Sequence, residues 1–205
     1  MSALVLHEYP ASGNCYKIRL TAAHLGLTLE RRSYNILKGE TRTAEFLATI
    51  NPNGRIPVLQ NGDLMLPESN AACFYLADGS ELIPDERFER ADMLRWMFWE
   101  QYNHEPNIAT LRFWLRHVGL EALSAAQRMQ IAVKREAGLA ALDLMDRHLS
   151  DRNFLVGDRF SIADICLFAY THVADEADLD LEAYPAVVGW LERIMLMPAH
   201  VGIDD

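Results

Sequence analysis

Over the first eighty residues, short apolar runs typical of strands alternate with segments whose apolar residues have helical spacing. Short apolar runs bounded by turn residues predict four strands, at residues 4–7, 29–34, 57–60 and 64–66. Helical patterns between them predict three helices, at residues 13–25, 44–49 and 69–77. The resulting order is βαβ-α-ββα. Two helical crossovers followed by a hairpin predict a mixed four-stranded sheet.

The predicted hairpin contains a specific turn signal. Asn61-Gly62 separates its two apolar runs. Asn-Gly favours the positive φ angles that both central residues of a type I′ turn require. We therefore expect a two-residue turn centred on this pair.

From Pro84 onward the pattern predicts helices and no strand. Apolar residues recur at helical spacing in four segments, at 94–115, 139–149, 167–170 and 188–195. Pro106 is expected to kink or divide the first of these segments. The predicted fold class is therefore α/β plus all-α. It has an α/β domain at 1–80, a linker at 81–86 and a helical bundle at 87–205.

Net charge divides the chain at the same place. The chain has 205 residues and a formal charge of −10, and residues 1–80 are neutral, so residues 81–205 carry all of that charge. A negative surface repels phosphate backbones, which makes nucleic acid a poor partner. The plainer interpretation, which we favour, is a solvated acidic surface.

Composition suggests a cytoplasmic protein. Half of the residues are hydrophobic, yet no apolar run approaches the ~20 residues of a membrane span. Residues 1–3 lead into the first strand without a basic segment, so no signal peptide is expected. The three cysteines are odd in number and far apart, which argues against a disulfide framework and fits a reducing compartment.

The junction between the first predicted strand and helix carries the most chemistry. It reads Ser12-Gly13-Asn14-Cys15. Thioredoxin-type redox proteins place Cys-x-x-Cys near a βαβ pattern of this kind, and here serine replaces the first cysteine. A reactive thiol would then come from a bound cofactor. The alternatives are that Ser12 and Asn14 only cap the helix, and that Cys15 is redox-active rather than structural; we favour a structural Cys15.

Four motifs occur in order along the chain. They are Ser12-Gly13-Asn14-Cys15-Tyr16-Lys17, Asn51-Pro52-Asn53-Gly54-Arg55-Ile56-Pro57-Val58-Leu59, Glu68-Ser69-Asn70-Ala71 and Gly157-Asp158-Arg159-Phe160-Ser161-Ile162-Ala163-Asp164. Together with the two-domain plan, they resemble the cytosolic glutathione S-transferase family. The resemblance is to its bacterial serine-type members, near the theta, zeta and nu classes. It covers essentially the whole chain.

The resemblance implies a thioredoxin-like N-terminal domain that binds glutathione and joins its sulfur to an electrophile. A thiol with pKa ~8.5 is mostly protonated at neutral pH, and lowering that pKa by ~2 units takes ~2.7 kcal/mol. One hydrogen bond to the thiolate supplies ~1.5–3 kcal/mol, and a helix N-terminus adds ~0.3–1 kcal/mol. Ser12 is expected to be the main donor and Asn14 a second one.

The other glutathione contacts also follow from the resemblance. Ile56-Pro57 matches a cis-proline dipeptide whose first residue pairs with the cysteinyl backbone, although an ordinary proline at a strand start is the alternative. Glu68-Ser69 matches the site for the γ-glutamyl ammonium and carboxylate, or else simply starts a helix. Lys38 and Arg55 are the cations expected near the glycyl carboxylate.

The helical domain is expected to supply the electrophile pocket, lying between the two domains. Tyr102 and Arg112 are its candidate residues, and Tyr9 and Ala11 beside the serine are alternative wall residues. Ser161-x-x-Asp164 matches the family's capping box and concerns folding rather than catalysis. The resemblance also implies a homodimer.

Two alternative functions stay open, and the sequence argues against a metal site. A glutathione-dependent disulfide reductase or peroxidase would use the same cofactor site, and a non-catalytic glutathione-binding or interaction protein would keep only the fold. No metal site is expected. His104-Glu105 lacks the second histidine that a zinc motif of this kind needs.

Overall fold

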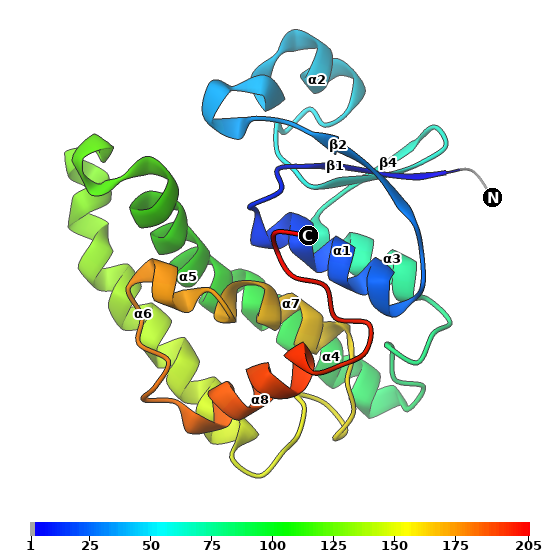
Figure 1. Ribbon diagram of the computed structural model, residues 1–205, viewed down its shortest axis with the longest axis vertical. Coiled ribbons are helices and arrows are strands. Elements are labelled where there is room, and N and C mark those ends of the chain that lie inside the picture. Colours follow the sequence, from blue (N-terminus) through cyan, green and yellow to red (C-terminus); the bar gives the residue numbers. More distant parts are fainter. Residues whose placement is uncertain (1–2) are drawn as a thin grey trace. The chain divides into compact units, whose positions relative to one another are not determined.

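The computed structural model describes residues 3–205, which form two compact units (Figure 1). The first unit extends to Ile83 and also includes Pro198–Asp205, whereas the second is Pro84–Met197. We expected the helical domain to continue to the last residue. The C-terminal segment clusters with the first unit instead, because side chains of that unit donate hydrogen bonds to its main-chain oxygens.

The first unit contains the predicted mixed sheet. Its strands have the spatial order β2-β1-β3-β4 and are β1 (Leu4–Glu8), β2 (Leu29–Ser33), β3 (Val58–Asn61) and β4 (Leu64–Pro67). β1 is parallel to β2 and antiparallel to β3, and β3 pairs with β4 in the hairpin. The predicted topology is confirmed.

Three α-helices accompany these strands, at the positions that the sequence predicts. They are α1 (Gly13–His24), α2 (Ala44–Thr49) and α3 (Ser69–Ala77). Two 3₁₀ turns, Ile36–Lys38 and Glu40–Arg42, precede α2. Figure 1 shows α1 and α3 side by side on one face of the sheet, with α2 on the other side. The starts of α1 and α3 are near each other, because the Ser69 hydroxyl donates to Asn14 Oδ1.

The prediction for the hairpin turn is wrong by one residue. Asn61 is the last residue of β3 and pairs with Leu64, so the loop is Gly62-Asp63. Gly62 has φ +61°, and the non-glycine residues with positive φ among those described are Glu68, Asp158 and Asp178. A type I′ turn needs positive φ at both central residues, and Asp63 does not supply it. Strand pairing takes Asn61 into the ladder and leaves glycine at the first turn position.

Alternation along β1 sends its side chains to opposite faces of the sheet. Leu6 is buried on the face that also carries Glu8, which binds Arg19 of α1. His7 faces the other way, where its ring nitrogens lie 2.8 Å from the Tyr34 hydroxyl and 2.9 Å from Gln60 Oε1. The buried polar group on that face is thus hydrogen-bonded.

The second unit is a bundle of helices joined by irregular turns. Its α-helices are α4 (Arg87–Trp99), α5 (Glu105–Arg112), α6 (Ala125–Leu149), α7 (Ile162–Thr171) and α8 (Pro185–Met195). Two π-helical segments, Glu100–His104 and Phe113–Val118, flank α5, and the 3₁₀ turns are Leu120–Ala122 and Ala174–Ala177. α6 begins earlier than the apolar spacing at 139–149 indicated.

Proline and burial explain two features of this bundle. Pro106 lies in the first turn of α5, where its missing N–H is tolerated, and the π-helical segment ends just before α5. The long segment is thus split into α4 and α5 by a π-helical segment, while its backbone stays helical across Pro106. All of α7 is buried, which accounts for its apolar residues on every side and makes it the central helix of the unit.

None of the helices in residues 3–205 is both long and apolar enough to cross a bilayer.

Candidate functional site

Ser12 is the N-cap of α1. Its backbone is extended (φ −79°, ψ 124°), and its Oγ accepts a long hydrogen bond of 3.5 Å from the amide of Cys15. The capping interpretation is therefore confirmed, but it uses only the acceptor side of the hydroxyl. A serine hydroxyl also has one O–H donor, and none of the residues described here accepts it within the unit. The side chain is half-buried at the helix start.

Cys15 is a core residue of the first unit. Its side chain is buried, and its Sγ lies 3.4 Å from the amide nitrogen of Tyr9, which donates to it. Burial raises the pKa of the Cys15 thiol to about 12, against the smaller opposing effects of the Tyr9 amide and Ser12. This thiol is protonated at neutral pH. The structure thus supports the structural interpretation of Cys15 rather than a redox role.

Two hydrogen bonds tie the start of α1 to the start of α3. The Ser69 hydroxyl donates to Asn14 Oδ1 at 3.1 Å, and the Lys17 ammonium donates to Asn70 Oδ1 at 3.1 Å. Lys17 is completely buried. Two motifs more than fifty residues apart are therefore joined into one site by side chains, with a buried cation beside it.

Glu68 precedes α3 in a rare backbone conformation. Its φ is +72° and its ψ is 109°, and its side chain is exposed. Non-glycine residues with positive φ are uncommon, and such strain of ~1–3 kcal/mol tends to occur where function requires it. Glu68 is thus an exposed acidic residue directly before α3, whose first backbone N–H groups have no partner within the helix.

The Ile56-Pro57 peptide bond is cis, as the motif predicts. The turn before it is organised by Asn51, a buried residue whose Nδ2 donates to the Arg55 carbonyl at 2.9 Å and whose Oδ1 accepts from the Asn53 amide at 3.0 Å. Pro57 is buried, and β3 begins directly after it.

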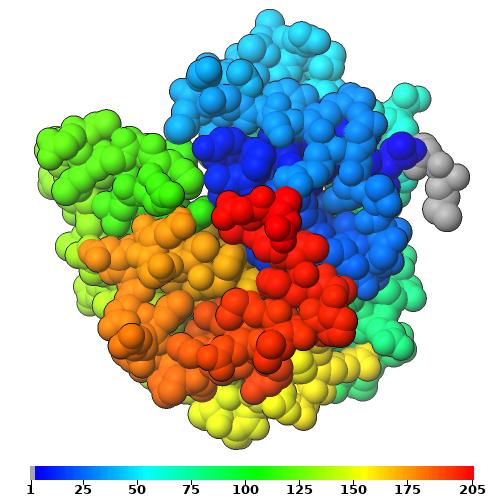
Figure 2. All heavy atoms as spheres, in the orientation of Figure 1, coloured from blue at the N-terminus to red at the C-terminus, as the bar shows by residue number. Residues whose placement is uncertain are grey.

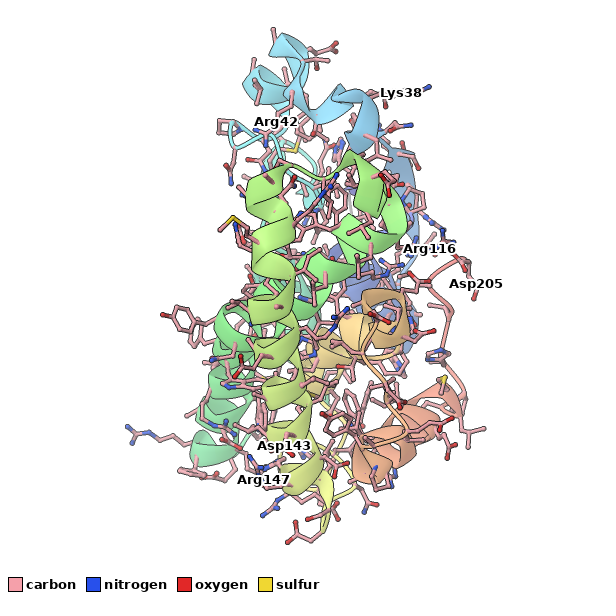
Figure 3. The ribbon with its side chains drawn as sticks, turned by 90° about the vertical axis from the view of Figure 1, so that its left-hand side faces the viewer. Lys38, Arg42, Arg116, Asp143, Arg147 and Asp205 are labelled. Atoms are coloured by element: carbon pink, nitrogen blue, oxygen red, sulfur yellow. The ribbon has the colours of Figure 1, made fainter. Side chains whose placement is uncertain are left out.

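The cations proposed for the glycyl carboxylate are exposed. Lys38 ends the 3₁₀ turn Ile36–Lys38, and Figure 3 shows its side chain pointing away from the ribbon. Arg55 is exposed next to the cis peptide. A third cation, Arg42, donates to the Asn53 carbonyl at 3.1 Å. Arg42 was not predicted as a site residue, because nothing in the sequence indicates that it contacts Asn53, 11 residues further along the chain.

Gly54 is required for this contact. Its φ is +63°, and a Cβ at this position would lie 2.8 Å from the Arg42 guanidinium. A side chain at residue 54 would therefore displace Arg42 from the turn, in addition to the strain of a positive φ.

The candidate electrophile residues come from both units. Tyr9 and Ala11 are half-buried in the turn that leads from β1 to Ser12. In the second unit Tyr102 is 84% exposed in the π-helical segment, whereas the Arg112 side chain is buried. Arg112 Nε donates to Glu176 Oε2 at 2.7 Å, so its charge has a partner inside its own unit.

Residues missed by sequence reasoning include Lys17 and Arg19. Both lie on α1 between apolar residues and are buried with specific partners, Asn70 and Glu8 respectively. Charged residues at positions that helical spacing marks as buried were the available signal. The described residues contain no group of three or more histidine, cysteine, aspartate or glutamate side chains arranged to hold a metal ion.

The first unit has the thioredoxin-like fold, but serine occupies the position of the leading cysteine and Cys15 is buried. The fold and site together define a thioredoxin-fold protein without a dithiol centre of its own.

Comparison with known proteins identifies the family. Residues 2–78 match the family model for the glutathione S-transferase N-terminal domain, and residues 120–193 match that for the C-terminal domain. A solved structure of glutathione S-transferase from Pseudomonas fluorescens is 45% identical, with a TM-score of 0.92 and complete coverage of both chains. "Glutathione S-transferase F14" of Arabidopsis thaliana is 33% identical over 85% of this chain and 72% of its own. The chain belongs to the glutathione S-transferase family.

Two further similar proteins have names or titles that mention a disulfide or oxidized glutathione. The "disulfide-bond oxidoreductase YfcG" of Escherichia coli is 30% identical, covering 91% of this chain and 87% of its own. The structure of glutathione transferase URE2P8 from Phanerochaete chrysosporium, described as with oxidized glutathione, is 25% identical with a TM-score of 0.83. That match covers 97% of this chain and 92% of the other.

Proposed function

We propose that this protein is a glutathione transferase that uses Ser12 to stabilise the thiolate of glutathione for attack on a small apolar electrophile. The observation that carries the proposal is the Asn14–Ser69 hydrogen bond, which joins the N-termini of α1 and α3. Helix N-termini favour anions. One site thus combines an unused hydroxyl donor with two anion-stabilising helix ends.

In the proposed reaction the glutathione thiol loses its proton to solvent. The resulting thiolate accepts a hydrogen bond from the Ser12 O–H. The Ser12 oxygen at the same time accepts a hydrogen bond from the Cys15 amide. The sulfur lone pair then forms a bond to an electrophilic carbon. Either a leaving group departs with its electron pair, or the electrons of a carbon–carbon double bond take a proton from water.

Asn14 has a different part in this proposal from Ser12. Its Oδ1 accepts from Ser69, so the side chain is held between the two helices and spans the site. We assign it as a second donor to glutathione, through its side-chain or main-chain N–H. Thiolate stabilisation then depends mainly on Ser12.

The remainder of glutathione is proposed to follow the two motif turns. Glu68 is exposed at the start of α3, where it pairs with the γ-glutamyl ammonium. The Ser69 hydroxyl is engaged by Asn14, so the main-chain N–H groups of Ser69 and the helix N-terminus bind the carboxylate. Ile56, before the cis-proline, pairs with the cysteinyl backbone, and Pro57 shapes that turn. Lys38 and Arg55 neutralise the glycyl carboxylate. The first unit is therefore proposed as the glutathione-binding domain.

The second unit is proposed to contribute to the electrophile site. Exposed Tyr102 offers an aromatic surface. Arg112 is proposed to act through its charge, which the ion pair with Glu176 holds in place. Tyr9 and Ala11 are the proposed wall residues from the first unit.

Disulfide reduction is the second candidate function. The relationship to the oxidoreductase of Escherichia coli favours it, and the same Ser12 and Asn14 would hold a mixed disulfide. A third candidate, non-catalytic glutathione binding, predicts affinity without turnover.

Calorimetric titration with glutathione and with glutathione disulfide tests these alternatives. We expect glutathione to bind more tightly, together with conjugation of a chloro-nitroaromatic that exceeds reduction of hydroxyethyl disulfide. Tighter binding of the disulfide with dominant reductase activity would favour the second candidate. Binding without either activity would favour the third, and no binding would overturn all three.

We also propose that the protein is a homodimer. Large apolar side chains are exposed on two helices of the second unit: Phe88 and Phe98 on α4, and Met129 and Val133 on α6. Apolar surface of this kind marks interaction sites when it is contiguous. Sedimentation equilibrium should give roughly twice the chain mass of 23.3 kDa, and Phe98→Asp should lower it. A single-chain mass for the unaltered protein at micromolar concentration would contradict the proposal.

A further inference from the structure

A buried ion cluster in the first unit has no part in the proposed reaction. Glu8, at the end of β1, is completely buried and binds two arginines. Arg19 Nη1 of α1 donates to its Oε2 at 3.2 Å, and Arg31 Nε of β2 donates to its Oε1 at 2.5 Å. A buried carboxylate needs such partners, because an unpaired charge in the interior is strongly destabilising.

Arg19 does more than neutralise Glu8. Its Nη2 donates to the Pro10 carbonyl at 3.0 Å and to the Ile203 carbonyl at 2.6 Å. Pro10 lies in the turn between β1 and α1, closed by a hydrogen bond from the Ser12 amide to the Tyr9 carbonyl at 2.9 Å. One guanidinium therefore connects the end of β1, the turn before Ser12 and the C-terminal segment.

The C-terminal segment Pro198–Asp205 also accepts hydrogen bonds from two other residues of the first unit. The Tyr16 hydroxyl donates to the Val201 carbonyl at 2.6 Å, and Arg31 Nη1 donates to the main-chain oxygen of Asp205 at 2.6 Å. Figure 2 shows this segment, in red, packed on the blue N-terminal part of the chain. The second arginine thus contacts Glu8 and the segment but not the turn.

We propose that Arg19 is a positioning residue for Ser12. Its guanidinium holds the Tyr9–Ser12 turn in place by donating to the Pro10 carbonyl, and the C-terminal segment keeps the guanidinium in place through the Ile203 carbonyl. The inference rests on the proposed function of Ser12. It adds a residue that does not touch glutathione but sets the geometry of the residue that does.

The chemistry of arginine explains why this position suits it. Its planar fork presents several donors in fixed directions, so one side chain can hold a carboxylate and two carbonyls together. A hydrogen bond to a thiolate weakens steeply when its angle is lost. Displacing catalytic groups by ~1 Å can lower rates about 100-fold, so a loosened turn should be visible in catalysis.

The test compares Arg19→Met with Arg31→Met. Both variants leave Glu8 with one arginine and remove one bond to the C-terminal segment, but only Arg19→Met frees the Pro10 carbonyl. The thiolate absorbance of bound glutathione is followed against pH. We expect its pKa to rise by about one unit in Arg19→Met, with kcat/KM at pH 6.5 about fivefold lower. In Arg31→Met we expect the thiolate pKa to change little.

Two further measurements separate positioning from general destabilisation. S-methylglutathione has no ionisable thiol, so its Kd should stay within about threefold in both variants. Arg19→Lys keeps the charge without the fork and should show an intermediate rise in the thiolate pKa. If Arg19→Met does not fold, the lysine variant is compared with Arg31→Met instead.

The outcomes are distinct. A thiolate pKa that moves equally in the Arg19 and Arg31 variants, or in neither, overturns the inference. If the unaltered protein binds neither ligand, the proposed function fails, and hydrogen exchange then decides on Arg19. In that case, faster exchange at the Ser12 and Tyr16 amides in the Arg19 variant alone supports positioning of the turn, and equal exchange in both variants refutes it.

Discussion

Replacing Ser12 by alanine is expected to raise the pKa of the thiol of bound glutathione by about 1–2 units. The expectation follows from the ~1.5–3 kcal/mol that a hydrogen bond to a charged group contributes. At pH 6.5 the thiolate fraction, and with it kcat/KM, should fall about 5- to 50-fold, since a thiol with pKa ~6.5 is half-ionised there. The loss should shrink as the pH rises through the new pKa, because the thiol then ionises without help. A pH–rate profile and the ultraviolet absorbance of the thiolate measure the effect.

Cys15→Ser is the matched control for this experiment. Cys15 lies in the same helical turn, its thiol is buried and protonated at neutral pH, and serine keeps an acceptor for the Tyr9 amide. The substitution should therefore leave the pH–rate profile in place. Ser12→Ala also removes a helix cap, which lowers stability by about 1 kcal/mol. The profile is therefore recorded well below the unfolding temperature. An unchanged thiolate pKa in Ser12→Ala, with a raised one in Asn14→Ala, would transfer the role of donor to Asn14.

The hydrogen bonds of Ser12 and Asn14 distinguish the roles that we propose for them. From the sequence alone both were possible caps and possible donors. The Ser12 cap uses one acceptor lone pair and leaves the O–H. The Asn14 carbonyl accepts from Ser69. Asn14 is consequently the residue that couples the two helix ends, and its substitution should weaken glutathione binding as well as catalysis.

Local signals in the sequence were sufficient for most of the first unit. Apolar runs, the turn cluster at 51–54 and the cis-proline motif depend on interactions between neighbours, and the observed elements start and end within one residue of the predicted ones. The hairpin turn was misplaced because the β3–β4 register, not the Asn-Gly pair itself, decides which residues are central.

Long-range side-chain contacts were not predictable in the same way. Arg19 and the Ile203 carbonyl are 184 positions apart, and Lys17 and Asn70 are 53 apart. No periodicity encodes such pairs. Their only trace in the sequence is a charged residue inside an apolar helix face, which indicates burial with a partner but not which partner.

Asp164 should give the largest loss of stability. Its buried carboxylate accepts four hydrogen bonds, from the Leu155 amide at 2.9 Å, the Ser161 amide at 3.0 Å, the Ser161 hydroxyl at 3.1 Å and Trp190 Nε1 at 3.0 Å. The capping box predicted from the sequence therefore also anchors the loop before α7 and a tryptophan of α8. Asp164→Ala leaves several buried donors without an acceptor, at ~1–3 kcal/mol each after partial relaxation.

We expect Asp164→Ala to lower the free energy of unfolding by about 4 kcal/mol, more than the ~1 kcal/mol of an ordinary cap. Urea unfolding followed by tryptophan fluorescence measures it. Asp143→Ala is the control, because Asp143 pairs with Arg147 on the exposed face of α6 (Figure 3) and such pairs contribute at most ~1 kcal/mol. Asp164 lies outside the proposed glutathione site, so the folded fraction of its variant should bind glutathione with nearly unchanged affinity. Equal losses in the two variants would show that the buried carboxylate does not hold the helical unit together.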